Sequence, residues 1–156
     1  MLRKHEIQSV INGIEKVKLN KLEDKSMSTV LFKDYMLLCG KLRQYRAEQE
    51  DLHNLFLKEH REEQEVVEKL QNDFNLEKDN EKRAKLANEI SSHEEYLNAV
   101  KAFNEKMAAL GNEVVKVELI DGEKFGEAYQ KTSEWDITVI GQLYPLFKED
   151  DTKPEE

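Results

Sequence analysis

The chain has 156 residues, a formal net charge of −9, and charged and hydrophobic fractions of 37% and 38%. This length fits one domain, residues 1–156, and six Gly and two Pro are too few for a β-sandwich with many turns. The negative charge repels phosphates, so we expect no nucleic acid partner. The single cysteine, Cys39, cannot form an internal disulfide, which fits a reducing cytoplasm. No apolar run approaches the roughly 18 residues that a membrane span needs, so we expect no membrane partner.

The N-terminal segment predicts a helix over residues 4–18. Gly13 weakens this helix slightly. The polar stretch that follows, residues 19–28, predicts a connector in which Ser26 or Ser28 caps the next helix. The apolar side chains of the first helix are spaced for one face and are Ile7, Val10, Ile11, Ile14 and Val17.

The dominant pattern is an apolar seam with alternating spacings of four and three residues, which predicts a long helix over residues 28–72. Such a seam must lie against another helix, and a second seam over residues 81–110 supplies one. The sequence therefore predicts a mainly α fold built on a long antiparallel helical hairpin that resembles a coiled coil. The positions of the first seam are Leu31, Tyr35, Leu38, Leu42, Tyr45, Gln49, Leu52, Phe56, Glu59, Glu63, Val66 and Leu70.

The tip of the hairpin is expected within residues 71–80, where three Asn and two Asp favour caps and turns. Asp79 or Asn80 would cap the return helix. Gly111–Asn112 is a strong signal for its C-terminal end.

Residues 113–147 predict a small α/β cap at the base of the hairpin. Residues 113–120 alternate and are rich in β-branched side chains, which indicates a strand. Asp121–Gly122 predicts a turn, and residues 124–131 predict one or two helical turns.

The last part of the cap allows two interpretations. Residues 135–143 fit a strand that pairs with the predicted strand over residues 113–120. They fit equally a short helix capped by Asp136. The end of the chain, residues 148–156, is an acidic tail.

A polar layer is expected in the middle of the hairpin. If the tip centres near Leu76, Glu59 faces His93, with His60 and Glu63 close by. A hydrogen-bonded layer that fixes the register is the favoured interpretation. The alternatives are a hydrated stretch where the helices separate and a metal site.

Motifs for catalysis are weak in this sequence. Glu50 and His53 have the Glu-x-x-His spacing of di-iron bundles, but those bundles need two such motifs and further carboxylates across four helices. We therefore predict no catalytic residue, no cofactor, no metal and no enzyme activity. The alternative is a metal-dependent helical-bundle enzyme that forms on dimerisation around His53, His60 and His93.

Candidate contacts with a protein partner lie in two regions. The first is the acidic run of the hairpin. The second is the cap, where the predicted strand has a free edge suited to dimerisation. In the same cap, Trp135, Tyr144 and Phe147 either pack on the base of the hairpin or face a partner. We predict a homodimer. The candidate interaction residues are Glu59, Glu62, Glu63, Glu65, Val114, Val117, Trp135, Tyr144 and Phe147.

Four segments in this order carry a family resemblance: residues 4–14, 41–46 (KLRQYR), 103–110 (FNEKMAAL) and 143–147 (LYPLF). Together they resemble a family of small uncharacterised proteins encoded by tailed bacteriophages and prophages. The resemblance implies a product in the host cytoplasm that serves as an assembly factor, a minor structural component or a modulator of a host protein. It transfers no catalytic residues.

These observations favour a non-enzymatic protein–protein interaction protein. The alternative from another class is an acidic inhibitor or nucleic-acid mimic that acts on a basic host protein through the acidic tip.

Overall fold

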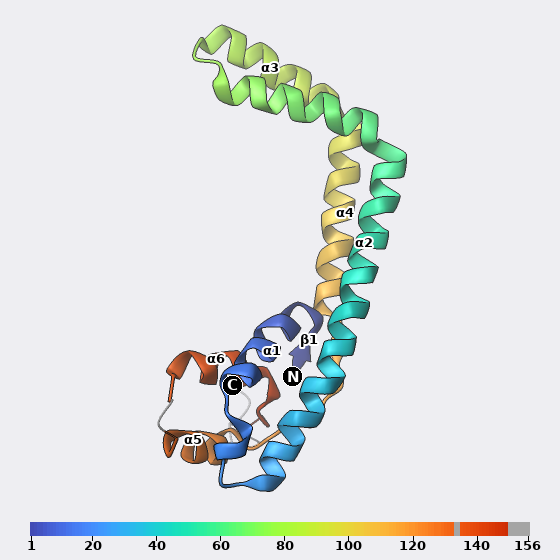
Figure 1. The fold of residues 1–156 in the computed structure, drawn as a ribbon. Helices are drawn as coiled ribbons and strands as arrows, with labels where there is room; N and C mark the ends of the chain where they lie inside the picture. Colours follow the sequence, from blue (N-terminus) through green and yellow to red (C-terminus); the bar gives the residue numbers. More distant parts are fainter. Residues whose placement is uncertain (133–134, 150–156) are drawn as a thin grey trace, which may run out of the picture. The chain divides into compact units, whose positions relative to one another are not determined.

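The computed structural model describes residues 1–132 and 135–149. It confirms the mainly α fold and the long hairpin, and its described residues also contain one two-stranded antiparallel sheet (Figure 1). Most of the predicted acidic tail, residues 150–156, lies outside the described residues. The elements are β1 (Leu2–Arg3), η1 (Lys4–Glu6), α1 (Ile7–Lys16), η2 (Leu19–Lys21), α2 (Lys25–Leu76), α3 (Asn80–Ser92), α4 (Glu94–Asn112), β2 (Val114–Val115), α5 (Gly122–Gln130), α6 (Ile137–Leu143) and η3 (Tyr144–Leu146).

Contacts divide the chain into two compact units. We call them the core unit, Met1–Arg46 with Leu110–Glu156, and the hairpin unit, Ala47–Ala109. The α2 helix contributes residues to both units. The cap and the base of the predicted hairpin therefore belong to one body, and the outer part of the hairpin forms the other.

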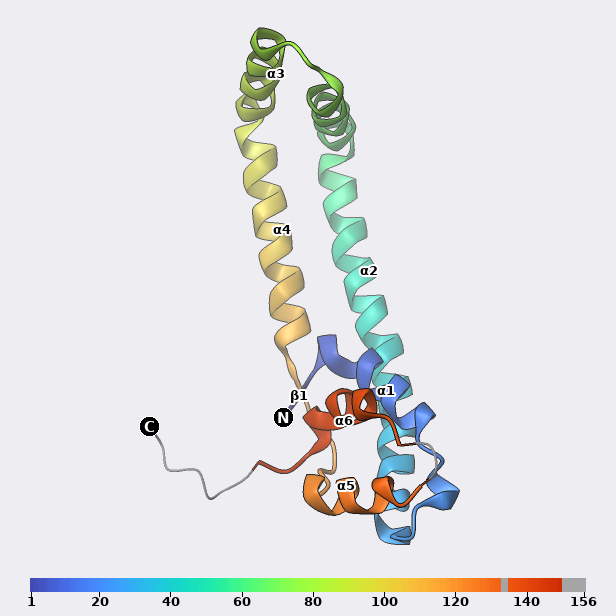
Figure 2. The same cartoon turned by 90° about the vertical axis from the view of Figure 1, so that its left-hand side faces the viewer.

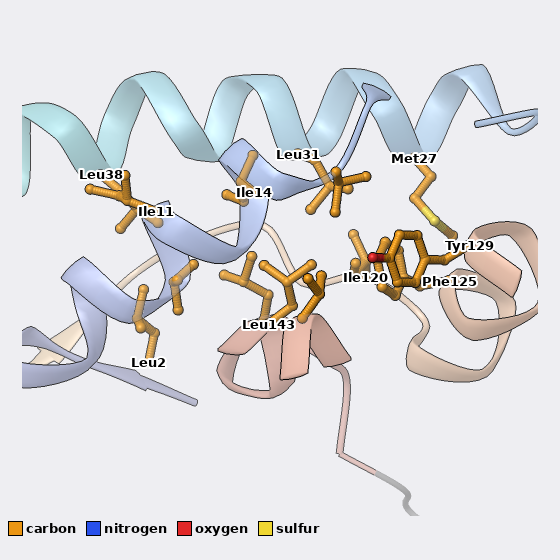
Figure 3. Packing of buried hydrophobic residues seen from close by; sticks show 14 of the residues in the cluster. Leu2, Ile11, Ile14, Met27, Leu31, Leu38, Ile120, Phe125, Tyr129 and Leu143 are labelled. Carbon is orange, nitrogen blue, oxygen red and sulfur yellow. The ribbon is translucent and has the colours of Figure 1, made fainter. Parts of the chain in front are cut away.

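The core unit is held together by apolar side chains from four helices. The predicted face of α1 is buried as expected, and α2 contributes Leu31 and Leu38. Figure 3 shows these two leucines pointing toward α1, with Leu143 of α6 pointing into the same core. Phe125 and Tyr129 of α5 stack with their ring centroids 5.4 Å apart and close one end. Burial of these side chains is the main source of the unit's stability.

Gly13 has a packing role that its helix propensity does not reveal. A Cβ atom at this position would lie 2.9 Å from Cβ of Gln142 and 3.0 Å from Cδ2 of Leu143. The absence of a side chain therefore lets α1 and α6 approach closely. The small loss of helix propensity is offset by this contact.

Aspartate side chains begin four of the helices. The prediction that Asp79 or Asn80 caps the return helix is confirmed for Asp79, which accepts hydrogen bonds from the backbone N–H groups of Glu81 and Lys82. The N-cap expected at Ser26 or Ser28 is instead Asp24, whose carboxylate accepts the Met27 N–H at 3.1 Å. An aspartate is as good a cap as serine, and its charge also favours the positive end of the helix.

The cap contains more helix and less strand than the sequence predicts. Asp121 caps α5 by accepting the N–H groups of Glu123 and Lys124, so the predicted turn at Asp121–Gly122 begins a helix. Asp136 caps α6, which confirms the helical alternative for residues 137–143 and excludes the strand there. The predicted α/β cap is thus mainly helical.

The predicted strand over residues 113–120 is reduced to β2. Its two residues pair with β1, in the register Leu2 with Val115 and Arg3 with Val114. In this antiparallel register the residues after Val115 run past Leu2, the first residue of β1, so β1 offers them no partner. Ile120 forms only an isolated parallel bridge with Phe147.

The return arm of the hairpin is two helices where the sequence predicts one. Figure 2 shows α4 beside α2, with α3 continuing to the tip. His93 separates α3 from α4 and has φ −83° and ψ 47°, which is not helical. The hydroxyls of Ser91 and Ser92 donate to the carbonyls of Ala87 and Glu89. Such bonds compete with the helical ladder, and their position accounts for the break.

The seam of α2 shifts by one residue in the hairpin unit. Leu31, Leu38 and Phe56 are buried as predicted, but the next inward residues are His60 and Val67 in place of Glu59 and Val66. A straight helix drifts by about 20° per heptad from a strict seven-residue repeat. Over the four heptads from residue 31 to residue 59 the drift is about 80°, close to the 100° that separates neighbouring residues.

Candidate interaction surfaces

The outer face of α2 in the core unit exposes three large apolar side chains. Phe32, Met36 and Leu37 have exposed fractions of 57%, 60% and 43%. Met36 and Leu37 follow Phe32 by four and five residues, which places the three side chains on one side of the helix, opposite Leu31 and Leu38. We call these three residues the α2 stripe. Gly40 continues this face, since a Cβ atom there would meet nothing within 4 Å.

The exposed charges that α2 itself carries beside the α2 stripe are all positive. Lys33, Lys41 and Arg43 are exposed, and they make no ion pair within the described part of the chain. Asp34 is the one acidic residue of α2 between Lys25 and Arg46, and it is buried. The stripe is therefore a basic and apolar surface on a chain with a net charge of −9.

Asp34 points into the core unit. Its carboxylate accepts a hydrogen bond from the backbone N–H of Glu118, and its Oδ2 atom has no hydrogen-bond partner within the described residues. Burial raises the pKa of Asp34 to about 6, because the charged form loses its hydration. The nearby Glu118 carboxylate raises the pKa further, whereas the backbone hydrogen bond opposes both effects.

The seam pattern does not predict the α2 stripe, because Phe32, Met36 and Leu37 lie beside the seam and not on it. The signal that could have identified them is the presence of large apolar residues outside the seam, next to lysines and without exposed acids.

The strand edge predicted for dimerisation is short. Val114 is exposed, but Val117 is half-buried and packs against the core of its own unit. A two-residue strand offers few free backbone groups to another chain. This edge is therefore a weaker candidate than the sequence suggests.

The three aromatic candidates of the cap differ in burial. Phe147 packs on Phe125 with ring centroids 5.7 Å apart and belongs to the core unit. Trp135 and Tyr144 are exposed, as is Ile137 at the start of α6. The Tyr144 ring also contacts the Phe147 ring, with centroids 6.1 Å apart, so packing accounts for Phe147 and for one edge of Tyr144.

The acidic candidates all lie on the surface of the hairpin unit. Glu59, Glu62, Glu63 and Glu65 are exposed. The unit contains 16 acidic and 9 basic side chains, so it carries a net charge of −7 and most of the negative charge of the chain.

The predicted polar layer of Glu59, Glu63 and His93 is wrong for its two glutamates. The one-residue shift of the seam places both on exposed positions. His60 lies inward instead, with its ring centroid 5.0 Å from Phe56 and 6.4 Å from Tyr96. The Glu59 carboxylate lies 3.7 Å from Nε2 of His60 at the edge of this cluster.

A hollow of about 210 Å³ lies between α2 and α4 in the hairpin unit. Phe56 and Phe103 both line it, with ring centroids 4.9 Å apart. Leu52 and Leu55 line it from α2, and Leu55 is 51% exposed. The polar side chains of the lining are Glu59, His60 and Lys106, so the hollow is a groove with apolar and polar parts.

Within residues 1–132 and 135–149, no group of three or more His, Cys, Asp or Glu side chains is arranged to hold a metal ion. None of the described helices is both long enough and apolar enough to cross a membrane. Cys39 is half-buried beside the core cluster.

Comparison with family models, with curated proteins and with solved structures finds no match to this chain. The class of this protein is therefore defined by its fold, which is mainly helical and contains a helical hairpin.

Proposed function

We propose that this chain is a non-enzymatic interaction protein that binds an acidic amphipathic helix of a protein partner on the α2 stripe. Phe32, Met36 and Leu37 carry the proposal, because exposed large apolar side chains grouped on one helix face are typical of interfaces. The resemblance to phage and prophage proteins suggests an assembly factor, a minor structural component or a modulator of a host protein.

The charge of the surface selects the partner. Lys33, Lys41 and Arg43 border the α2 stripe, so glutamates or aspartates beside the apolar face of the partner helix would pair with them. Such pairs steer association and disfavour basic partners. Apolar contacts between the two helices would supply most of the affinity.

Site-specific photocrosslinking tests this proposal. A photoreactive amino acid at Met36 is expected to form an adduct in an extract of the cells that express the protein, and the crosslinked segment is expected to be acidic and amphipathic. Lys33→Glu combined with Arg43→Glu should remove this adduct. The same amino acid at Leu76, which is 80% exposed on the hairpin unit, serves as the control and should not form it. Adducts with nucleic acid or with a basic segment, or adducts equal at both positions, would overturn the proposal.

The acidic hairpin unit supports a second candidate function. Its net charge of −7 and its exposed glutamates suit an inhibitor or nucleic-acid mimic that competes for a basic protein surface. Binding of this kind falls steeply with salt. Charge reversal at Glu62, Glu63 and Glu65 should abolish it, and retention of binding would exclude this function.

A further inference from the structure

We propose that the hairpin unit forms a four-helix bundle with a second copy of itself, in which Leu55 of each copy fills the groove of the other. This interface is separate from the α2 stripe, and it lies entirely within residues 47–109.

Near Leu55 the two sides of the groove differ in side-chain size, since α4 contributes Ala99 and Ala102 there. The remaining lining residues are Leu52, Phe56, Glu59 and His60 of α2 and Phe103 and Lys106 of α4. Leu55 is half in solvent although it borders this groove. One helix thus offers a large apolar side chain, and the other offers the space for one.

Ring contacts fix the level of these residues along the hairpin. The Phe103 ring lies 4.9 Å from the Phe56 ring and 6.1 Å from the His53 ring. Ala102, which precedes Phe103, therefore lies level with Leu55. The large side chain of Leu55 and the small side chain of Ala102 thus line the same groove at the same level.

This arrangement is complementary to itself under two-fold symmetry. A two-fold axis along the hairpin places α2 of one copy over α4 of the other and preserves the level of each residue. Leu55 of each copy then lies over Ala99 and Ala102 of the other. Every neighbouring pair of helices is antiparallel, as in four-helix bundles.

The charges at the end of the groove fit the same arrangement. Lys106 lines the groove three residues beyond Phe103, which places it near the level of Leu52. In the dimer it would lie beside Asp51 of the second copy. Asp51 and Lys106 are both exposed within one chain. The pair would therefore add register specificity at the rim of the interface.

The thin core of the hairpin unit gives a reason for pairing. Among the described residues, its cluster buries only Phe56, Val67 and Tyr96. Small units with few buried side chains commonly gain stability by oligomerisation. A second copy would cover Leu52 and Leu55 without disturbing the existing contacts.

Light scattering on the full chain tests the proposal at protein concentrations of about 5–200 µM. In this range a dimer with a micromolar dissociation constant dissociates measurably at the lower end. The wild type is expected to have the mass of two chains, and Leu55→Lys the mass of one. Ala102→Leu fills the groove with an apolar side chain and should give the same loss, which separates loss of pairing from loss of folding. Leu76→Lys, at a more exposed leucine of the same unit, should remain dimeric.

Charge exchange and crosslinking then fix the geometry. Asp51→Lys and Lys106→Asp should each weaken dimerisation about tenfold, and the double variant should recover most of the loss, as expected for a close charge pair. In a Cys39→Ser background, Leu55→Cys mixed with Ala102→Cys should form a covalent dimer on oxidation, whereas Leu55→Cys alone should not.

Three results would overturn the proposal: a monomeric wild type at all concentrations, a dimeric Leu55→Lys variant, or equal crosslinking by Leu55→Cys alone. None of these results bears on the α2 stripe, so this inference and the proposed function can fail separately.

Discussion

The core unit and the hairpin unit use α2 in different ways. Within the described residues, the core unit buries 17 hydrophobic side chains in one cluster, and the hairpin unit buries three. In the core unit α2 is covered by α1 and other elements, whereas in the hairpin unit its partners are α3 and α4. One continuous helix thus takes part in a compact core at one end and in a two-layer hairpin at the other.

This difference indicates where the chain is stable and where it is open to partners. Local opening costs little free energy where few apolar contacts must be broken. The hairpin unit is the part of the chain that fits this description, and it also carries most of the negative charge.

Truncation of a core leucine should have the largest effect. Leu143→Ala removes a fully buried side chain, and such changes destabilise proteins by about 2–5 kcal/mol. Leu97→Ala removes a half-buried side chain of the hairpin unit and should cost about 1 kcal/mol. Urea unfolding of both variants measures the two losses. Equal losses would contradict the contrast between the units.

Asp34 is a buried charge within the stable unit, and its removal should increase stability at neutral pH. The folded-state pKa of about 6 lies above the usual 3.8, so the folded state holds the proton more tightly. The stability that this group contributes is therefore full below about pH 4 and is lost as the pH rises toward 6. Asp34→Asn should be more stable than the wild type by about 2 kcal/mol at pH 7.5, within the upper limit set by a shift of this size.

The same comparison at pH 4 provides the control for Asp34. The wild-type carboxyl group is then largely protonated, and the variant should differ little from it in free energy of unfolding. A gain of the same size at both pH values would show that the charge of Asp34 is not the cause.

Two glycine variants separate packing from helix propensity. Gly13→Ala should lose about 1–2 kcal/mol, because its new methyl group meets Gln142 and Leu143 of α6. Gly40→Ala lies on the exposed face of α2, meets no atom within 4 Å, and should gain up to about 1 kcal/mol. Thermal unfolding of both variants is the measurement, and a gain at both positions would contradict the close contact between α1 and α6.

Spacing and side-chain type predict the first helix, the long helix and part of their packing. The burial of Ile7, Val10 and Ile14, the seam from Leu31 to Phe56, and the cap at Asp79 all follow from spacing and side-chain type. These features depend on neighbours in sequence, so the sequence alone contains the information for them.

The features that the sequence did not predict depend on accumulated geometry or on distant contacts. The one-residue shift at His60 results from a small drift summed over several turns. The length of β2 depends on β1, which lies more than a hundred residues earlier. The exposure of Phe32 and Met36 depends on which faces of α2 the other elements cover. The seam shift and the strand length cannot be read from one local pattern, whereas large apolar residues outside the seam give a partial signal for the exposed face of α2.

Hydrogen exchange of backbone amides at several protein concentrations tests the central contrast most directly. We expect strong protection in α1 and α6 at every concentration, and weaker protection in α4 that rises with concentration as the hairpin units pair. Equal protection in the two units, with no dependence on concentration, would contradict this contrast.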